Sequence, residues 1–256
     1  MVEVLPVRAF SDNYIWMLID ASKQFAACVD PGDAKPVNQF LEQHRLKLSH
    51  ILLTHHHFDH TGGVSSLVQQ HQPMLFGPAT ETLPCQPVKL VEGDKIQLET
   101  HQLELSILDL PGHTAGHIAY YGAGKLFCGD TLFACGCGRL FEGTPEQMHH
   151  SLSKLAALPE NTEVYCTHEY TQSNIQFALA VEPDNPDLQK QQHWVEQQRN
   201  KDLPTLPSNI GLEKATNPFL RCDENTIKAA ANRYAGKTLD SPVAVFSAIR
   251  KWKDSF

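Results

Sequence analysis

The sequence lacks several features that define other classes of protein. No run of 18 apolar residues occurs, which is the length that a transmembrane helix needs. Positive charge is scarce, since 21 Lys and Arg residues stand against 29 Asp and Glu residues, for a net charge of -8. A protein that binds duplex nucleic acid needs a basic surface. We therefore expect neither a membrane nor a nucleic acid as partner.

An apolar leader and a cysteine framework are also missing. Glu3, Pro6 and Arg8 lie within the first ten residues, where the core of a secretory signal is apolar. The seven cysteines are scattered through 256 residues, a length that can bury a large core without disulfides. We expect free thiols and a cytoplasmic protein, and we expect it to be a monomer.

Apolar patterns divide the chain into a mixed part and a helical part. Strand patterns at 2–7, 14–19, 25–30 and 51–53 alternate with helical ones at 36–44, 62–70 and from the cap residue Thr144 to about 157. Later helices are predicted over 173–181, 186–200, 223–234 and from Ser241 to about 253, with a proline-rich loop over 203–218. We expect an α/β domain over 1–168 and a smaller helical domain over 169–256.

Histidine is concentrated in one short segment. Five of the 14 histidines fall within the eleven residues 50–60, and residues 54–60 read T-H-H-H-F-D-H directly after an apolar strand pattern. His55 and His57 project the same way because they are two residues apart, and Asp59 and His60 lie one turn further on. Imidazole and carboxylate suit zinc, iron or manganese. The segment therefore predicts a loop that binds two cations.

Two metal ions need more ligands than this loop supplies, and three later residues can provide them. His113, Asp130 and His168 each follow an apolar strand pattern, in the segments P-G-H-T, G-D-T and T-H-E-Y. A carboxylate has two oxygens and can bridge, so Asp130 is the natural link between the metals. One isolated histidine is more often a hydrogen-bonded core residue, but this set of seven residues favours a metal centre.

These motifs resemble the metallo-β-lactamase superfamily, and the whole chain, including its helical end, resembles the glyoxalase II (hydroxyacylglutathione hydrolase) family within it. The resemblance rests on T-H-x-H-x-D-H, P-G-H-T-x-G-H, G-D-T-L-F and H-E-Y-T. It implies a four-layered αββα sandwich followed by a smaller all-α C-terminal domain that binds glutathione. It also implies the ligand assignment, which is His55, His57 and His113 for the first metal, Asp59, His60 and His168 for the second, and Asp130 as the bridge.

The implied activity is hydrolysis of S-2-hydroxyacylglutathione, such as S-D-lactoylglutathione, to glutathione and a 2-hydroxy acid such as D-lactate. This is the second step of methylglyoxal detoxification. Two divalent ions, for which zinc is expected and iron or manganese is compatible, lower the pKa of a water between them and stabilise the oxyanion. His55, His57 and Asp130 are then catalytic as ligands, and Asp59 also orients the nucleophile.

The resemblance further implies a set of residues that bind the glutathione moiety: Arg139, Phe141, Tyr170, Arg250 and Lys253. Eukaryotic members of the family have Lys and Tyr at the first two positions. Arg139 can still pair with a carboxylate, whereas Phe141 has no hydroxyl to donate. From the residues alone, Arg250 and Lys253 share one face of the last predicted helix, and a solvated basic helix end is the favoured interpretation there. The resemblance reverses this preference.

Two other functions stay open. A glutathione persulfide dioxygenase of the same fold uses a single iron, which leaves Asp59 and His60 without a metal. The second alternative is a binding protein in which the metal site is structural, and such a site is closed to water. His56 points away from His55 and His57 and is expected to be structural, whereas His117 is expected to support the ligands rather than to bind metal. C-G-C at 135–137 is expected to be loop structure.

Overall fold

The computed structural model describes residues 2–256; Met1, the first residue of the expected domain 1–168, lies outside them. The chain forms two compact units. The first runs to Asp109 and resumes over Ala115–Gly129, and the second consists of Leu110–Thr114 and Asp130–Phe256. The boundary at residue 168 follows the change of pattern along the sequence and stays a prediction.

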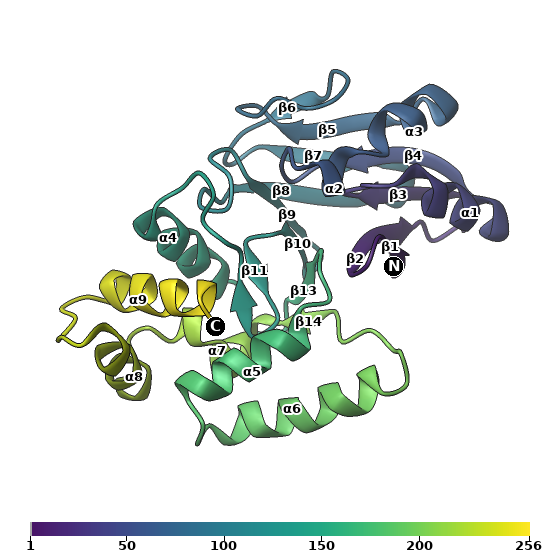
Figure 1. Cartoon of the computed structure of the whole chain (residues 1–256). Coiled ribbons are helices and arrows are strands. Elements are labelled where there is room, and N and C mark those ends of the chain that lie inside the picture. Colours follow the sequence, from purple (N-terminus) through teal and green to yellow (C-terminus); the bar gives the residue numbers. More distant parts are fainter. Residues whose placement is uncertain (1) are drawn as a thin grey trace. The chain divides into compact units, whose positions relative to one another are not determined.

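A six-stranded sheet forms part of the first unit (Figure 1). Its strands lie in chain order: β1 (Glu3–Ala9), β2 (Asn13–Ile19), β3 (Phe25–Val29), β4 (Lys47–Leu52), β5 (Met74–Pro78) and β6 (Val88–Leu90). The first three strands are antiparallel, and β3 to β6 are parallel. Parallel neighbours need crossovers. These are α1 (Ala34–His44) after β3, and α2 (Phe58–Thr61) with α3 (Val64–His71) after β4.

The helices α1 and α3 bury their apolar faces in the core of this sheet. Val37 and Leu41 of α1 and Leu67 of α3 belong to one buried cluster with Met17 and Ile51 of the strands. All of β2 is buried, which agrees with the run of largely apolar residues after Asn13. The sheet is therefore a rigid base for the loop that follows β4.

A second group of strands in the first unit is antiparallel. It contains β7 (Lys95–Leu98), β8 (Leu103–Asp109), β9 (Ile118–Gly122) and β10 (Lys125–Gly129), with the short helix η1 (Glu99–His101) between β7 and β8. The Tyr120 hydroxyl of β9 donates to the Leu53 carbonyl at 2.8 Å, and the Ile118 amide donates to the Thr54 carbonyl at 2.9 Å. These bonds fix the residues that follow β4.

The second unit is mostly helical (green to yellow in Figure 1). It contains β11 (Leu132–Phe133), β12 (Gly136–Cys137), α4 (Pro145–Ala156), β13 (Glu163–Cys166), α5 (Thr171–Val181), α6 (Pro186–Arg199), β14 (Ser208–Asn209), α7 (Ile210–Thr216), η2 (Pro218–Leu220), α8 (Asn225–Ala235) and α9 (Pro242–Asp254). The strands β11 and β12 pair as a two-stranded ribbon. The predicted cap of α4 is confirmed, because Thr144 and Gln147 form a capping box.

The helices predicted over 36–44, 173–181, 186–200 and 223–234 are confirmed to within two residues at each end. Two other predictions are wrong in part. The loop over 203–218 contains β14 and α7, because the Asn209 side chain accepts from the Leu212 amide at 2.8 Å and starts a helix. The helix over 62–70 is preceded by α2, so Asp59 and His60 lie in a helical turn.

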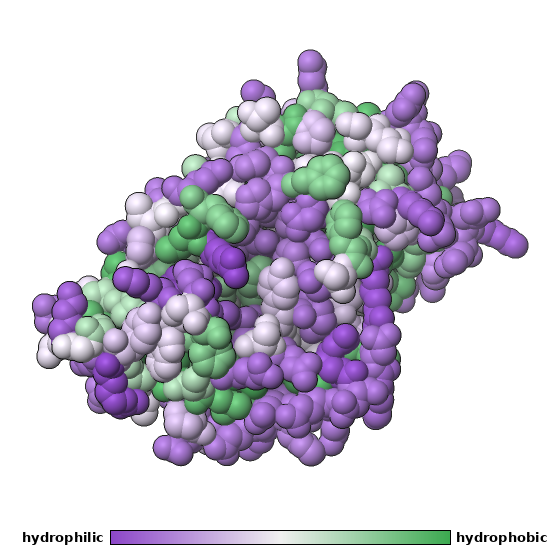
Figure 2. All heavy atoms as spheres, viewed as in Figure 1, coloured by the Kyte–Doolittle hydropathy of each residue, from purple (hydrophilic) through white to green (hydrophobic). Residues whose placement is uncertain are grey.

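The surface agrees with the composition. Hydrophilic residues predominate on the face shown in Figure 2, and hydrophobic residues occur there in small groups. Within residues 2–256, every helix is too short or too polar to cross a bilayer.

Candidate metal centre

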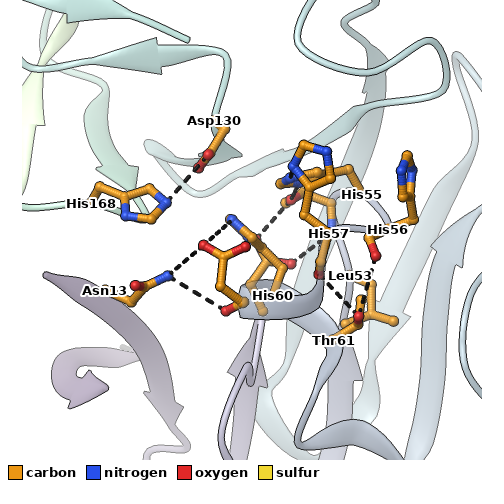
Figure 3. A network of polar contacts seen from close by, with 12 residues as sticks. Asn13, Leu53, His55, His56, His57, His60, Thr61, Asp130 and His168 are labelled. Carbon is orange, nitrogen blue, oxygen red and sulfur yellow. Dashed lines mark hydrogen bonds and ion pairs between the residues drawn. The ribbon is translucent and has the colours of Figure 1, made fainter. Parts of the chain in front are cut away.

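The first unit brings four predicted ligands together in the loop after β4 and in α2. His55 and His60 are completely buried. The His55 Nε2 and the His57 Nδ1 lie 3.0 Å apart (Figure 3), and the His60 Nε2 lies 3.6 Å from the Asp59 Oδ2. Donor atoms arranged tetrahedrally around zinc at about 2.0–2.1 Å are about 3.3 Å from one another. The spacing within each of these two pairs therefore fits two donors that share a cation.

Asp30 organises this loop, and the sequence analysis missed it. It follows β3 in a left-handed conformation, with φ 51°, and is buried. Its carboxylate accepts from the Thr54 amide and hydroxyl at 2.8 and 2.7 Å and lies 3.0 Å from the His60 Nδ1. A carboxylate on one imidazole nitrogen orients the other nitrogen toward a metal. The sequence feature that could have identified Asp30 is its position between a strand pattern and the dipeptide Pro-Gly.

Two further residues of the first unit fix Asp59. The Asn13 side-chain amide donates to the Asp59 Oδ2 at 3.0 Å. Gly32 lies so close that a Cβ there would be 1.8 Å from the Asp59 carbonyl oxygen. Any other residue at position 32 would displace Asp59, so the Pro-Gly turn has a steric role at the site.

The histidines expected to support the ligands have other partners in the first unit. The His56 Nδ1 lies 3.0 Å from the Glu81 Oε2, and the Glu81 Oε1 also accepts from the Gly116 amide at 3.2 Å. His117 is buried and its ring stacks on His55, with centroids 4.8 Å apart. Both contacts restrict the rings beside the predicted ligands.

The second unit brings the other three predicted ligands together. The Asp130 Oδ2 lies 3.5 Å from the His113 Nε2 and 3.3 Å from the His168 Nε2, and all three residues are buried. The His113 Nδ1 is 2.9 Å from the Arg139 carbonyl oxygen, which leaves Nε2 as the nitrogen that faces Asp130. At these separations the Asp130 carboxylate fits a ligand that could be shared between a cation bound by His113 and a cation bound by His168.

Two of the predicted glutathione-binding residues border these ligands. The exposed Phe141 ring lies 5.2 Å from the His113 ring, and Tyr170 stacks on His168 with centroids 4.6 Å apart and planes 6° apart. Arg139 is exposed in the segment just before Phe141. Residues that could contact an organic ligand therefore lie directly beside His113 and His168.

Arg250 and Lys253 of α9 are not part of a solvated helix end. Arg250 is buried and donates to the Cys137 carbonyl at 2.9 Å and to Asp254 at 3.0 Å. Lys253 is half-buried, donates to the Asn174 side chain and lies 5.6 Å from the centre of the Phe177 ring. Burial, followed by the nearby positive charge of Arg250, lowers the pKa of Lys253 to about 8.

Comparisons with known proteins agree with this arrangement. The model of the metallo-beta-lactamase superfamily matches residues 16–168, and the model of the hydroxyacylglutathione hydrolase C-terminus matches residues 169–256. A hydroxyacylglutathione hydrolase of Nitrosomonas europaea is 56% identical over 256 residues, which cover 100% of this chain and 97% of the relative.

Solved structures with low sequence identity share the fold. ETHE1 from Myxococcus xanthus has a TM-score of 0.66 at 23% identity, with 100% of this chain and 99% of that chain covered. TTHA1623 in a di-iron-bound form has a TM-score of 0.61 at 24% identity, with 84% and 100% covered. The predicted fold class is thus confirmed as α/β, with a metallo-β-lactamase fold and a helical C-terminal region.

Proposed function

Because the chain belongs to the hydroxyacylglutathione hydrolase family of the metallo-β-lactamase superfamily, we propose that it hydrolyses S-2-hydroxyacylglutathione thioesters such as S-D-lactoylglutathione. The products are glutathione and a 2-hydroxy acid such as D-lactate, which is the second step of methylglyoxal detoxification. The observation that carries this proposal is the full-length match to a hydroxyacylglutathione hydrolase together with all seven ligand types at the matching motifs.

We propose that the enzyme uses two divalent metal ions. The assignment follows the family resemblance: His55, His57 and His113 bind the first ion, Asp59, His60 and His168 bind the second, and Asp130 bridges. Within each unit, the separations between donor atoms support it. Zinc is the expected metal, and the same nitrogen and oxygen donors also accept iron or manganese.

When bound, the two ions supply a nucleophilic water at neutral pH and polarise the thioester carbonyl. The protein orients the donors, since Asp30 fixes the His60 ring and the Arg139 carbonyl fixes the His113 ring. Asp59, held by Asn13, is placed to accept a hydrogen bond from the attacking water. The leaving thiolate has an ordinary pKa of about 8.5 and departs with little need of a proton donor.

We assign recognition of the glutathione moiety to the five residues named by the resemblance: Arg139, Phe141, Tyr170, Arg250 and Lys253. The contacts of Phe141 with His113 and of Tyr170 with His168 support the assignment of these two residues, because each ring lies directly against a predicted ligand. The exposed Arg139 has a guanidinium that can pair with a glutathione carboxylate through two hydrogen bonds.

The decisive experiment combines metal analysis with an assay on purified protein. We expect two metal ions per chain, hydrolysis of S-D-lactoylglutathione, loss of activity with a chelator and recovery on adding zinc. One iron per chain with oxygen consumption on glutathione persulfide would instead establish the dioxygenase. A protein that holds two metals and leaves S-D-lactoylglutathione intact contradicts the proposal.

The small-molecule substrate, a cytoplasmic location and a monomeric state complete the proposal. All seven cysteines are free thiols, six of them buried, which fits a reducing compartment. Light scattering on the eluted protein checks the monomer against the chain mass of 28.6 kDa.

A further inference from the structure

Residues 130–139 form a short segment that we call the ligand ribbon, because it begins at Asp130 and contains β11 and β12. Buried side chains of the helical region bind its backbone at every residue from 133 to 137. The Asn217 side chain donates to the carbonyls of Phe133 at 3.1 Å and Gly136 at 2.8 Å. Asn174 donates to the carbonyl of Ala134 and Arg250 to that of Cys137, both at 2.9 Å. In the opposite direction, the Cys135 amide donates to the Glu213 carboxylate at 2.8 Å.

The ligand ribbon contacts all three ligands of the second unit. Asp130 is its first residue. The Phe133 ring packs edge-on against His168, with centroids 5.8 Å apart. The Arg139 carbonyl lies 2.9 Å from the His113 Nδ1. A shift of the ligand ribbon would therefore move one ligand directly and remove the contacts that orient the other two.

Glu213 of α7 and Asn217, which directly follows α7, bind the backbone of the ligand ribbon at residues 133, 135 and 136. Both residues are completely buried. The Glu213 Oε2 accepts from the Cys135 amide and from the Asn217 side chain at 2.9 Å, and its Oε1 accepts from the Ser208 hydroxyl. Removing a buried acceptor leaves its donors unsatisfied, which destabilises the arrangement that they hold. Nothing in the assigned chemistry uses Glu213 or Asn217, so their burial in this position calls for another role.

We propose that Glu213 and Asn217 are positioning residues of the metal centre, which act by fixing the ligand ribbon and, through it, the geometry of His113, Asp130 and His168. The inference rests on the proposed function only in taking these three residues as metal ligands. It extends the role of the helical region beyond binding glutathione.

The test measures metal binding rather than turnover. Glu213→Leu removes both acceptors, Asn217→Ala removes the donor to the ribbon carbonyls, and Glu213→Gln keeps one acceptor for the Cys135 amide. Glu182→Leu is the matched control, because Glu182 is a buried carboxylate of the same unit that bonds Arg221, Thr226 and Asn185 instead of the ribbon. Each apoprotein is titrated with cobalt(II) against a chelator, and its visible spectrum and thermal unfolding are recorded.

We expect Glu213→Leu and Asn217→Ala to bind cobalt roughly 10- to 100-fold more weakly, with an altered visible spectrum, as is typical when a residue that orients ligands is lost. Glu213→Gln should restore both readouts. Glu182→Leu should lower the melting temperature and leave the affinity for cobalt unchanged.

The inference is overturned if Glu213→Leu and Asn217→Ala keep the wild-type affinity and spectrum, or if Glu182→Leu weakens cobalt binding as much as they do. Should Glu213→Leu fail to fold, Asn217→Ala and Glu213→Gln still decide the question. A wild-type protein that binds metal normally but does not hydrolyse S-D-lactoylglutathione contradicts the proposed function and leaves this comparison intact.

Discussion

The two units build their shares of the predicted metal centre in different ways. The first unit carries His55, His57, Asp59 and His60 in one short segment after β4, fixed by Asp30, which follows β3, and by Asn13 of β2. The second unit collects His113, Asp130 and His168 from three distant segments. A local loop on a rigid sheet keeps its geometry through a few nearby contacts, whereas the dispersed ligands depend on a ribbon held by side chains far along the chain.

The units also differ in the ionisable groups that they bury. The first unit buries His50, whose pKa is lowered to about 4 by burial and, secondarily, by the nearby His101. The second unit buries Glu213, whose pKa is raised to about 7 by burial despite three hydrogen bonds that favour the ionised form. Acid and base should therefore weaken different parts of the molecule.

The largest expected effect is at the proposed bridge. Asp130→Ala removes the carboxylate that faces both His113 and His168. We expect it to lose at least one metal ion per chain and to reduce kcat by roughly 10³-fold, because charge stabilisation and the nucleophile both depend on the metals. Asp20→Asn, at a buried carboxylate of the first unit, is the control. Two metals retained with near-normal turnover would refute the bridging role.

The next effect concerns pH and separates the units. As pH falls from 6.5 to 4, His50 takes up a proton in the unfolded chain but not in the folded one, so the free energy of unfolding decreases by up to about 3 kcal/mol. Urea unfolding of the apoprotein should show this loss, and His50→Leu should reduce it. Parallel pH curves for the two proteins would exclude His50 as its source.

Glu213 has the opposite dependence. As pH rises from 4.5 through 7, the unfolded chain releases this proton before the folded one does, so stability is lost over that range. Glu213→Gln should match the wild type at pH 4.5 and exceed it by up to about 3 kcal/mol above pH 7. A gain that does not change with pH would show that the carboxyl group titrates normally.

Asp30→Asn tests how the first unit holds its metal ligands. The amide keeps one acceptor for Thr54 and loses the second, which orients His60. We expect metal affinity to fall roughly 10- to 100-fold, with the spectrum of bound cobalt changed. Asp33→Asn, at an exposed cap of α1, serves as control. If Asp30→Asn binds metal normally, the loop does not need this carboxylate.

Replacing Lys253 and replacing Arg250 of α9 should have different effects. Lys253→Ala removes the proposed charged contact to glutathione, which is expected to raise KM roughly 5- to 100-fold with kcat nearly unchanged. Arg250→Ala should also weaken metal binding, because Arg250 bonds the carbonyl of Cys137 in the ligand ribbon. An unchanged KM for S-D-lactoylglutathione in both variants would remove these residues from substrate recognition.

The sequence reveals what is encoded locally. The clustered histidines and the capping residues Thr144 and Ser241 predict a metal loop and helix starts directly, because each signal depends on neighbours in the chain. Asp30 and Glu213 were missed because their partners lie 24 and 78 residues away in sequence. The ribbon strands β11 and β12 are two residues long, too short for any periodicity to indicate them.

The smallest expected effect is at Phe141, which is 62% exposed beside His113. Family members with tyrosine at this position have a hydroxyl that can donate to the substrate, so Phe141→Tyr should restore one neutral hydrogen bond. Such a bond contributes about 0.5–1.5 kcal/mol, which corresponds to a KM for S-D-lactoylglutathione lower by roughly 2- to 10-fold. Because the expected contact is to the glutathione moiety and not to the reacting carbonyl, it should stabilise ground and transition states alike and leave kcat nearly unchanged. Phe141→Leu controls for the loss of the ring against His113 and should raise KM. If Phe141→Tyr leaves KM unchanged while Phe141→Leu raises it, the ring contributes packing alone and glutathione does not extend a polar group to this position.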